Sequence, residues 1–220
     1  MTLAIFDLDN TLLAGDSDHA WGEFLVERGI VEEDYYREAN DRFFHAYQAG
    51  DLDIHEYLAF ALEPLSRHPL ETLLQWREDF FENFIRPLIL PAGRELLAEH
   101  RSQGHHLMII TATNRFVTEP IAQALGVETL IATDPEFQHG RYTGAVAGTP
   151  SFREGKVVRL NQWLNQNQET LADAWFYSDS HNDLPLLEAV PHPIAVDPDP
   201  TLEAAARERR WPIMSLRHAS

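Results

Sequence analysis

Two aspartates lie two residues apart at the end of an apolar stretch near the N-terminus. Leu3–Phe6 is a short apolar run typical of a buried strand, and Asp7 and Asp9 follow it. Side chains two residues apart on a strand point to the same side, so the two carboxylates face one cleft. They repel each other unless a proton or a cation lies between them, and Mg²⁺ prefers carboxylate oxygens. The pattern indicates a divalent-cation site or, alternatively, a strand end with two solvated acids.

Three later stretches also offer side chains that could bind an anion or a metal. Two are apolar strands, 108–113 and 175–178, and the third is the start of a helical segment at Gly155. Ligands of parallel α/β sheets bind beyond the carboxyl ends of the strands, so we expect these side chains to converge on one site. The side chains concerned are Thr111, Lys156, Asp179 and Asp183.

These residues form four motifs, namely Asp7-Leu8-Asp9-Asn10-Thr11, Thr111, Lys156, and Asp179 with Asp183. In order and spacing the motifs resemble those of the haloacid dehalogenase (HAD) superfamily of phosphohydrolases. The resemblance covers essentially the whole chain and points to subfamily IB, the phosphoserine-phosphatase-like group. It implies a Mg²⁺-dependent phosphomonoester hydrolase that acts on a small phosphorylated metabolite through an aspartyl-phosphate intermediate.

The resemblance also assigns a role to each catalytic side chain. Asp7 is expected to attack phosphorus, and Asp9 to protonate the leaving group and then activate water. Thr111, beside the backbone N–H of Ala112, is expected to bind phosphoryl oxygens, and Lys156 to neutralise their developing charge. The alternative readings are a threonine that caps a strand end and a lysine exposed at a helix start.

A metal site is implied by the same motifs. Asp7, Asp179 and the backbone carbonyl of Asp9 are expected to hold Mg²⁺, with waters and a phosphate oxygen completing an octahedral shell. Asp183 is expected to orient this site, often through another ligand. Asn182 matches a position that contacts phosphate in the phosphoserine phosphatases, so we expect it to bind substrate.

Two departures from the phosphoserine enzymes concern substrate choice. The phosphoserine enzymes use an arginine of the cap to hold the substrate carboxylate. The matching position in this chain is near Ala61, and it has no arginine. Asp16 stands where those enzymes carry a glutamate, and Asp18 is a second acid beside it. An acidic entrance suits a substrate with an amine better than one with a carboxylate. Histidinol phosphate has such an amine, so it is a candidate together with a phosphoserine-like ester.

Other functions are compatible with the same residues. A phosphotransferase would pass the phosphoryl group from Asp7 to an acceptor alcohol. A non-catalytic phosphate-binding regulator would keep the fold without turnover, which the presence of Thr111, Lys156 and the catalytic acids argues against. An interaction module could use the aromatic residues of the helical segment for dimerisation, and we expect a monomer or a homodimer.

The composition excludes several classes of partner. The 220 residues include 17 basic and 35 acidic side chains, a net charge of −18, which argues against nucleic acids and anionic membranes. With 44% hydrophobic residues the chain can bury a sizeable core, and it has no cysteine for disulfides or thiol chemistry. The N-terminus goes straight into a strand, with no basic or long apolar leader, so we expect a cytoplasmic protein.

Strands that alternate with helices predict an α/β fold, with a Rossmann-like parallel sheet and helices on both faces. Residues 18–86 are instead helical throughout, in roughly four helices, which matches the inserted all-helical (C1-type) cap of the family. We therefore expect the catalytic core at 1–15 and 88–220 and the cap at 16–87. The expected strands are 3–6, 106–111, 129–132, 175–178 and 193–196, with a β-hairpin at 137–146.

Overall fold

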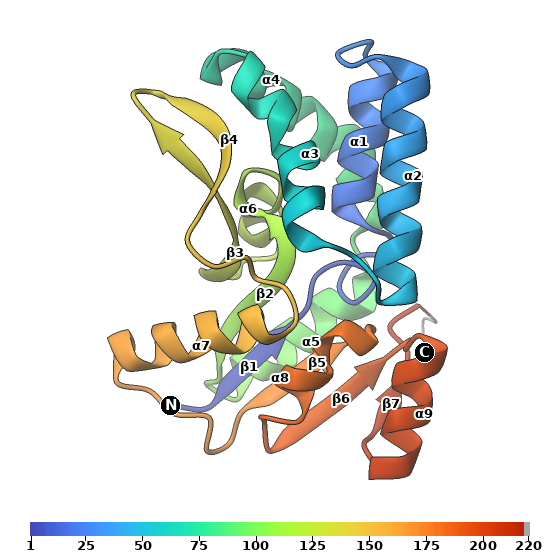
Figure 1. The fold of residues 1–220 in the computed structure, drawn as a ribbon. Helices are drawn as coiled ribbons and strands as arrows, with labels where there is room; N and C mark the ends of the chain where they lie inside the picture. Colours follow the sequence, from blue (N-terminus) through green and yellow to red (C-terminus); the bar gives the residue numbers. More distant parts are fainter. Residues whose placement is uncertain (218–220) are drawn as a thin grey trace.

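The computed structural model describes residues 1–217 and is built on one seven-stranded sheet (Figure 1). Its strands are β1 (Leu3–Phe6), β2 (His106–Asn114), β3 (Thr129–Gln138), β4 (Arg141–Ala147), β5 (Trp175–Ser178), β6 (His192–Val196) and β7 (Ile213–Met214). The order across the sheet is β4-β3-β2-β1-β5-β6-β7, and all neighbours are parallel except β3 and β4. The carboxyl end of β1 therefore lies between those of β2 and β5.

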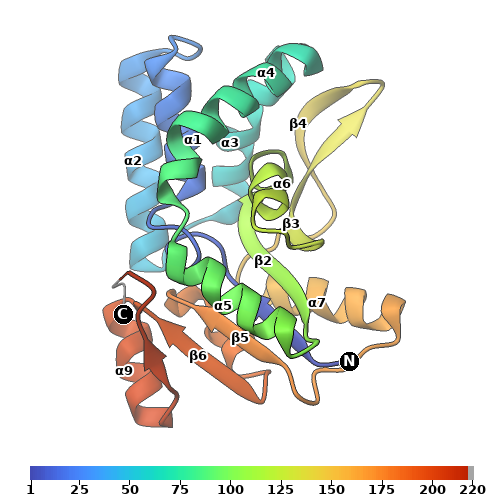
Figure 2. The same cartoon turned by 180° about the vertical axis from the view of Figure 1, so that it is seen from behind.

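Helices cover both faces of the sheet, which confirms the predicted α/β class (Figures 1 and 2). They are α5 (Pro91–Ser102) and α6 (Arg115–Ala124) on one face, and α7 (Glu154–Asn167), α8 (Leu184–Leu187) and α9 (Pro200–Arg209) on the other. Along β1, Ala4 and Phe6 pack into the first layer, whereas Leu3 and Ile5 pack into the second. Because both sides of this central strand are buried, it is apolar at every position.

Four helices follow β1 and lie beyond the carboxyl ends of β1 and β2; we call them the helical insertion (Figure 1). They are α1 (Ser17–Glu27), α2 (Glu33–Ala49), α3 (Ile54–Arg67) and α4 (Leu70–Phe80), and a π-helical turn, η1 (Phe81–Ile85), and a 3₁₀ turn, η2 (Arg86–Leu88), lead back to the core. Trp21 packs on Phe24 and Phe80, with ring centroids 5.2 and 5.0 Å away. Within residues 1–217, no helix is both long and apolar enough to cross a membrane.

The two segments that join the helical insertion to the core are hydrogen-bonded to each other. The Ala14 N–H donates to the Leu88 carbonyl at 2.7 Å, and the Leu90 N–H donates to the Leu12 carbonyl at 3.1 Å. The chain thus leaves and re-enters the core through one paired connection. On the other side, the β3–β4 hairpin packs along α3 (Figure 1), where a Cβ built at Gly144 would lie 3.4 Å from Ser66.

The sheet differs from the predicted one at both edges. The expected separate strand at 129–132 and hairpin at 137–146 are joined, because β3 continues without a break to Gln138. Pro135 supplies no backbone donor, and the pairing with β4 shifts register between Pro135 and Phe137. The alternating sequence pattern is therefore interrupted at Pro135, although the strand itself continues. β7 was not predicted, because two residues are too few to show an alternating pattern.

Candidate active site

The residues singled out by the sequence meet at the carboxyl ends of β1, β2 and β5 and at the start of α7, beneath the helical insertion. Most of them are less than 10% exposed, and Asp9, Asp16 and Asp179 are half-buried. Acidic and basic side chains reach this degree of burial only when they are paired or bind a ligand. The buried members are Asp7, Thr111, Lys156, Asn182 and Asp183.

Lys156 joins two of the aspartates. Its Nζ lies 2.7 Å from Asp7 Oδ1 and 2.7 and 2.8 Å from the two oxygens of Asp183. Burial alone would lower the pKa of Lys156, but the charges of Asp183 and Asp7 outweigh it and hold this pKa above its ordinary value. The ammonium group is therefore charged at neutral pH. Ser178 donates a further hydrogen bond to Asp183 Oδ2 at 2.7 Å, which fixes the third member of this triad.

A tight turn sets the position of Lys156. The Gly155 N–H donates to the Phe152 carbonyl at 2.8 Å, and a Cβ at Gly155 would overlap the carbonyl oxygen of Pro150. Only glycine fits there without moving the turn. The pair Gly155-Lys156 thus opens the helix as predicted, with the glycine allowing the close approach and the lysine pointing to Asp7.

Asp7 and Asp179 share the hydroxyl of Thr11. This hydroxyl donates to Asp179 Oδ1 at 3.1 Å, accepts from the Asp179 N–H at 3.1 Å, and lies 3.4 Å from Asp7 Oδ2. Burial raises the pKa of Asp7 to about 7, with Lys156 offsetting part of the effect, and burial followed by the charge of Asp7 raises the pKa of Asp179. Two adjacent carboxylates whose ionised forms are disfavoured fit a divalent cation, which would reverse both effects.

Asp9 is held differently from Asp7. Its Oδ1 accepts a hydrogen bond from the Ser17 N–H at 2.7 Å, and its Oδ2 accepts one from the Thr113 hydroxyl at 2.8 Å and lies 3.4 Å from Thr111 Oγ1. Burial, followed by the charge of Asp16, raises the pKa of Asp9 to about 6. A carboxyl group that titrates near neutral pH can both give and take a proton during a reaction.

Asn182 lies at the contact between the core and the helical insertion. Its Nδ2 donates to the Tyr47 carbonyl at 3.1 Å, and its Oδ1 accepts from Arg153 Nε at 2.9 Å. The expected phosphate-binding amide is thus occupied by two protein partners in this structure. Sequence reasoning had assigned no role to Tyr47 or Arg153.

A cavity extends from Asp7 and Asp9 into the helical insertion. Asp16 caps α1, because its Oδ1 accepts the N–H groups of Asp18 and His19 at 2.9 Å each. Asp18 accepts a hydrogen bond from Tyr57, and burial followed by the charge of Asp16 raises the pKa of Asp18 to about 8. The aromatic part of the wall is Phe43, Phe44, Tyr47, Tyr57 and Phe152.

The basic group that would hold a substrate carboxylate is not part of this wall. Within residues 1–217, no lysine or arginine lines the cavity. Ala61, where the cap arginine was sought, is only 6% exposed and lies outside the lining. Thr113 also lines the cavity, and the sequence had suggested a role for its backbone N–H but none for its side chain, although the spacing from Thr111 on one strand places both side chains on the same side.

Comparison with known proteins agrees with this geometry. The haloacid dehalogenase-like hydrolase family matches residues 4–188. A histidinol-phosphatase of Neisseria meningitidis serogroup C (strain 8013) is 44% identical over 219 residues, which cover 98% of this chain and 99% of that protein. A protein of unknown function from Bordetella pertussis Tohama I has a TM-score of 0.92 at 46% identity, with 98% of both chains covered.

A phosphoserine phosphatase, solved as a phospho-aspartyl intermediate analogue, has a TM-score of 0.70 over 98% of this chain and 93% of its own. At 18% identity this likeness shows the fold alone. The family match covers residues 4–188, well over half of the chain, and the N. meningitidis relative covers 98% of it. The chain therefore belongs to the haloacid dehalogenase-like hydrolases, and the predicted phosphatase assignment is confirmed.

Proposed function

We propose that this phosphatase hydrolyses a small phosphomonoester in a Mg²⁺-dependent reaction, through an aspartyl-phosphate formed on Asp7. The observation that carries the proposal is the buried triad, in which Lys156 lies 2.7 Å from Asp7 and from Asp183. A carboxylate fixed at the end of the central strand, beside a charged ammonium group, suits attack on an anionic phosphorus centre.

The metal site would use oxygen atoms already gathered around Thr11. Asp7, Asp179 and the backbone carbonyl of Asp9 would hold Mg²⁺, while Asp183 orients the site through its contact with Lys156. The side-chain oxygens of Asp9 accept hydrogen bonds from Ser17 and Thr113, so the backbone carbonyl is the part of Asp9 that would bind the metal. The cation would favour the ionised forms of Asp7 and Asp179 and neutralise phosphate charge.

Two displacements at phosphorus account for the reaction. First, an oxygen of Asp7 attacks phosphorus, the bond to the ester oxygen breaks, and Asp9 gives that oxygen its proton. Second, Asp9 takes a proton from water, the water oxygen attacks phosphorus, and the bond to Asp7 breaks to release inorganic phosphate. Thr111 and the Ala112 N–H would bind the phosphoryl oxygens in both steps, and Lys156 would balance their charge.

The helical insertion would act as a cap that selects the substrate. We assign residues 16–87 to this cap and the rest of the chain to the catalytic core, because the two parts are joined by the paired connection around Ala14 and Leu88. Such a connection can bend while the sheet and the helices stay intact.

The cavity wall suits an ester that carries a positive charge and a planar group. Asp16 and Asp18 would face the positive charge, and the aromatic side chains would pack on the ring and stabilise the cation. A substrate carboxylate would meet these acids with no lysine or arginine lining the cavity within residues 1–217. Histidinol phosphate has an amine and an imidazole, and we take it as the first candidate.

The test is phosphate release from a panel of esters with and without Mg²⁺. The panel contains histidinol phosphate, imidazolylpropanol phosphate, which lacks the amine, phosphoserine, sugar phosphates and nucleotides. Release should require Mg²⁺, disappear in Asp7→Asn protein that circular dichroism shows to be folded, and be fastest with histidinol phosphate. Release that survives in Asp7→Asn or in chelator would overturn the mechanism, and transfer of phosphate to added glycerol would indicate a phosphotransferase.

A further inference from the structure

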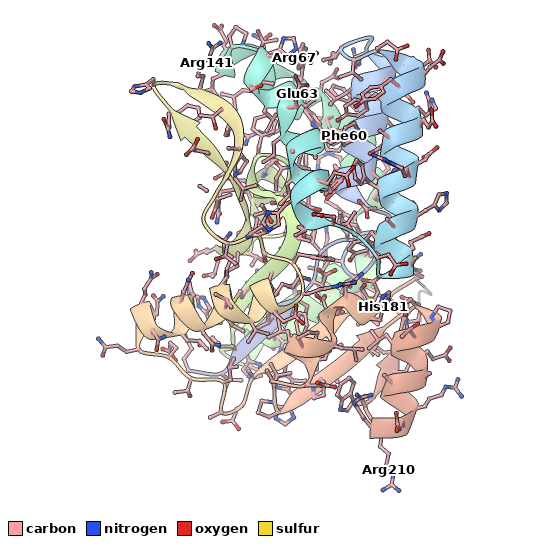
Figure 3. The ribbon with its side chains drawn as sticks, viewed as in Figure 1. Phe60, Glu63, Arg67, Arg141, His181 and Arg210 are labelled. Carbon is pink, nitrogen blue, oxygen red and sulfur yellow. The ribbon has the colours of Figure 1, made fainter. Side chains whose placement is uncertain are left out.

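The C-terminal end of α2 rests on two core loops that carry catalytic residues (Figures 1 and 3). The helix ends at Gly50, whose φ of 77° is the left-handed conformation common at helix ends. Beneath it lie Arg153, just before α7, and the 3₁₀ turn η3 (His181–Asp183) that follows β5. Figure 3 shows His181 directly below the end of α2. Lys156 lies in the first turn of α7, three residues after Arg153, and Asp183 is the last residue of η3.

Arg153 bridges the helix end and the loop after β5. Its Nε donates to Asn182 Oδ1 at 2.9 Å, its Nη2 donates to the Gly50 carbonyl, and its guanidinium lies over the Phe152 ring, 5.0 Å from the ring centroid. Carbonyls in the last turn of a helix lack intrahelical partners and carry partial negative charge, so a guanidinium is a fitting donor to them. The planar fork of arginine can serve both acceptors at once.

Two further bonds attach the last turn of α2 to the core. Asn182 Nδ2 donates to the Tyr47 carbonyl at 3.1 Å, and the Tyr47 hydroxyl donates to Ser180 Oγ at 3.4 Å. The helix end is therefore capped by side chains of the core, and Arg153 and Asn182 are bonded to each other within this contact.

The backbone of Arg153 is itself unusual. Its φ of 49° and ψ of −122° lie in a region that residues other than glycine rarely occupy, and its carbonyl accepts the Lys156 N–H at 3.0 Å. Such a conformation persists only where the surrounding contacts hold it. A change at Arg153 therefore acts on the first turn of the helix that aims Lys156, while Asn182 is the neighbour of Asp183.

We propose that Arg153 is a positioning residue, which couples docking of α2 to the placement of Lys156 and Asp183. With α2 docked, Gly50 and Asn182 hold the guanidinium and the strained turn keeps Lys156 between its two aspartates. When α2 lifts, Arg153 loses the Gly50 carbonyl and the turn relaxes. Only the kinetic test of this inference depends on the proposed function, because the hydrogen-exchange test needs no turnover.

The kinetic test compares Arg153→Met and Arg153→Lys with Arg159→Met, a control on the same helix whose guanidinium contacts Asp134 and the Thr149 carbonyl instead. With p-nitrophenyl phosphate as the probe, we expect Arg153→Met to lower kcat by about 10- to 100-fold, as for loss of charged hydrogen bonds, with KM nearly unchanged. Arg153→Lys should fall between, and the control should stay near wild type. An unchanged kcat, or a rise in KM alone, would overturn the proposal.

A second variant disturbs the same contact from the other side. A Cβ at Gly50 would lie 2.7 Å from Nε2 of His181, whose Nδ1 is fixed at 2.8 Å from Asp199, so Gly50→Ala should lift the helix end. Because both changes break one contact, Gly50→Ala with Arg153→Met should lower kcat no further than the worse single variant. Additive losses would mean that the two residues act separately and would refute the coupling.

Hydrogen exchange tests the contact without turnover. In folded Arg153→Met, amides of 47–51 and of 154–157 should both exchange faster than in wild type, and Gly50→Ala should likewise raise exchange in 154–157, since coupling is reciprocal. Faster exchange in only one of the two segments would overturn the inference. If both segments respond but no ester is hydrolysed, the proposed function fails while the structural coupling stands.

Discussion

The acidic residues on the two sides of the cavity differ in their charged partners. We call the core residues around Asp7, Lys156 and Asp183 the floor, and the part of the helical insertion that carries Asp16 and Asp18 the roof. On the floor, Lys156 lies between Asp7 and Asp183, so a fixed positive group is paired with both of these carboxylates. In the roof, formed by the helical insertion, Asp16 accepts hydrogen bonds from backbone N–H groups, and Asp18 has Tyr57 and Asn114 as partners, with no lysine or arginine among the partners in residues 1–217. Burial and the charge of Asp16 raise the pKa of Asp18 to about 8. The ionised form of Asp18 would therefore be favoured by a ligand that supplies positive charge.

We therefore expect the floor to determine the rate of the chemical steps and the roof to determine which ester is preferred. Loss of Lys156 from the floor should slow the hydrolysis of every ester alike, because all substrates share the phosphate group, whereas loss of Asp9 should depend on how readily the ester oxygen leaves. Changes in the roof should matter only for esters whose remaining part interacts with it.

Lys156→Met should have the largest effect. It removes the charge that balances the phosphoryl group, and we expect kcat to fall by about 10³-fold for every ester tested. It also leaves Asp7 and Asp183 buried without their partner, which should lower the free energy of unfolding in the absence of metal by about 3–5 kcal/mol. Steady-state kinetics and urea denaturation measure the two effects.

Arg159→Met serves as the control for loss of a positive charge on the same helix, and it should leave kcat near wild type. If Lys156→Met slows esters with an amine far more than esters without one, the lysine would belong to substrate selection, and the division between floor and roof would fail.

Asp9→Asn should come next, with an effect that depends on the leaving group. An alkoxide leaving group needs the proton of Asp9, so kcat/KM for an alkyl ester such as histidinol phosphate should fall by about 10²–10³-fold. The nitrophenolate of p-nitrophenyl phosphate leaves readily without a proton, so its kcat/KM should fall much less. Equal losses for the two esters would exclude Asp9 as the general acid.

Asp18→Asn should have a smaller and selective effect. Removing its charge should lower kcat/KM for histidinol phosphate by about tenfold, the size of a partly screened charge–charge contact, and leave imidazolylpropanol phosphate unaffected. Glu78→Gln, a change of an exposed acid on α4, controls for the loss of one negative charge from the insertion. The same loss for both esters would place Asp18 outside amine recognition.

The floor was more predictable from the sequence than the roof. Asp7 and Asp9 follow an apolar strand, and parallel strands bring their carboxyl ends together, so the meeting of Asp7, Lys156 and Asp183 followed from motif order and fold class. The direct bonds of Lys156 to both aspartates did not follow, since residues 149 and 27 positions away along the chain meet only through the tertiary structure.

Of the roof, only the two acidic residues Asp16 and Asp18 could be predicted from the sequence. Its aromatic wall comes from α2, α3 and the loop at Phe152, and which faces of amphipathic helices turn toward a cavity depends on how the helices pack. Arg153 shows the same limit, because a charged residue before a helix usually lies in solvent, and the unusual backbone that turns it toward Gly50 leaves no mark in the sequence. For the sheet, the alternation of elements was sufficient for the central strands, whereas β3 was predicted in two pieces and the short edge strand β7 was missed.

The smallest effect concerns stability, and it tests the roof without a substrate. In the folded protein burial raises the pKa of Asp18 to about 8 from an unfolded value of 3.8, so its contribution to stability is complete below about pH 4 and is lost as the pH rises toward 8. Asparagine does not titrate, so the gain in free energy of unfolding from Asp18→Asn should increase between pH 5 and pH 8, to on the order of 1 kcal/mol. Urea denaturation of metal-free protein at both pH values, with Glu78→Gln beside it, measures this difference. A gain that is constant or shrinks as the pH rises would show that the roof does not strain its acids, and the contrast with the floor would then rest on geometry alone.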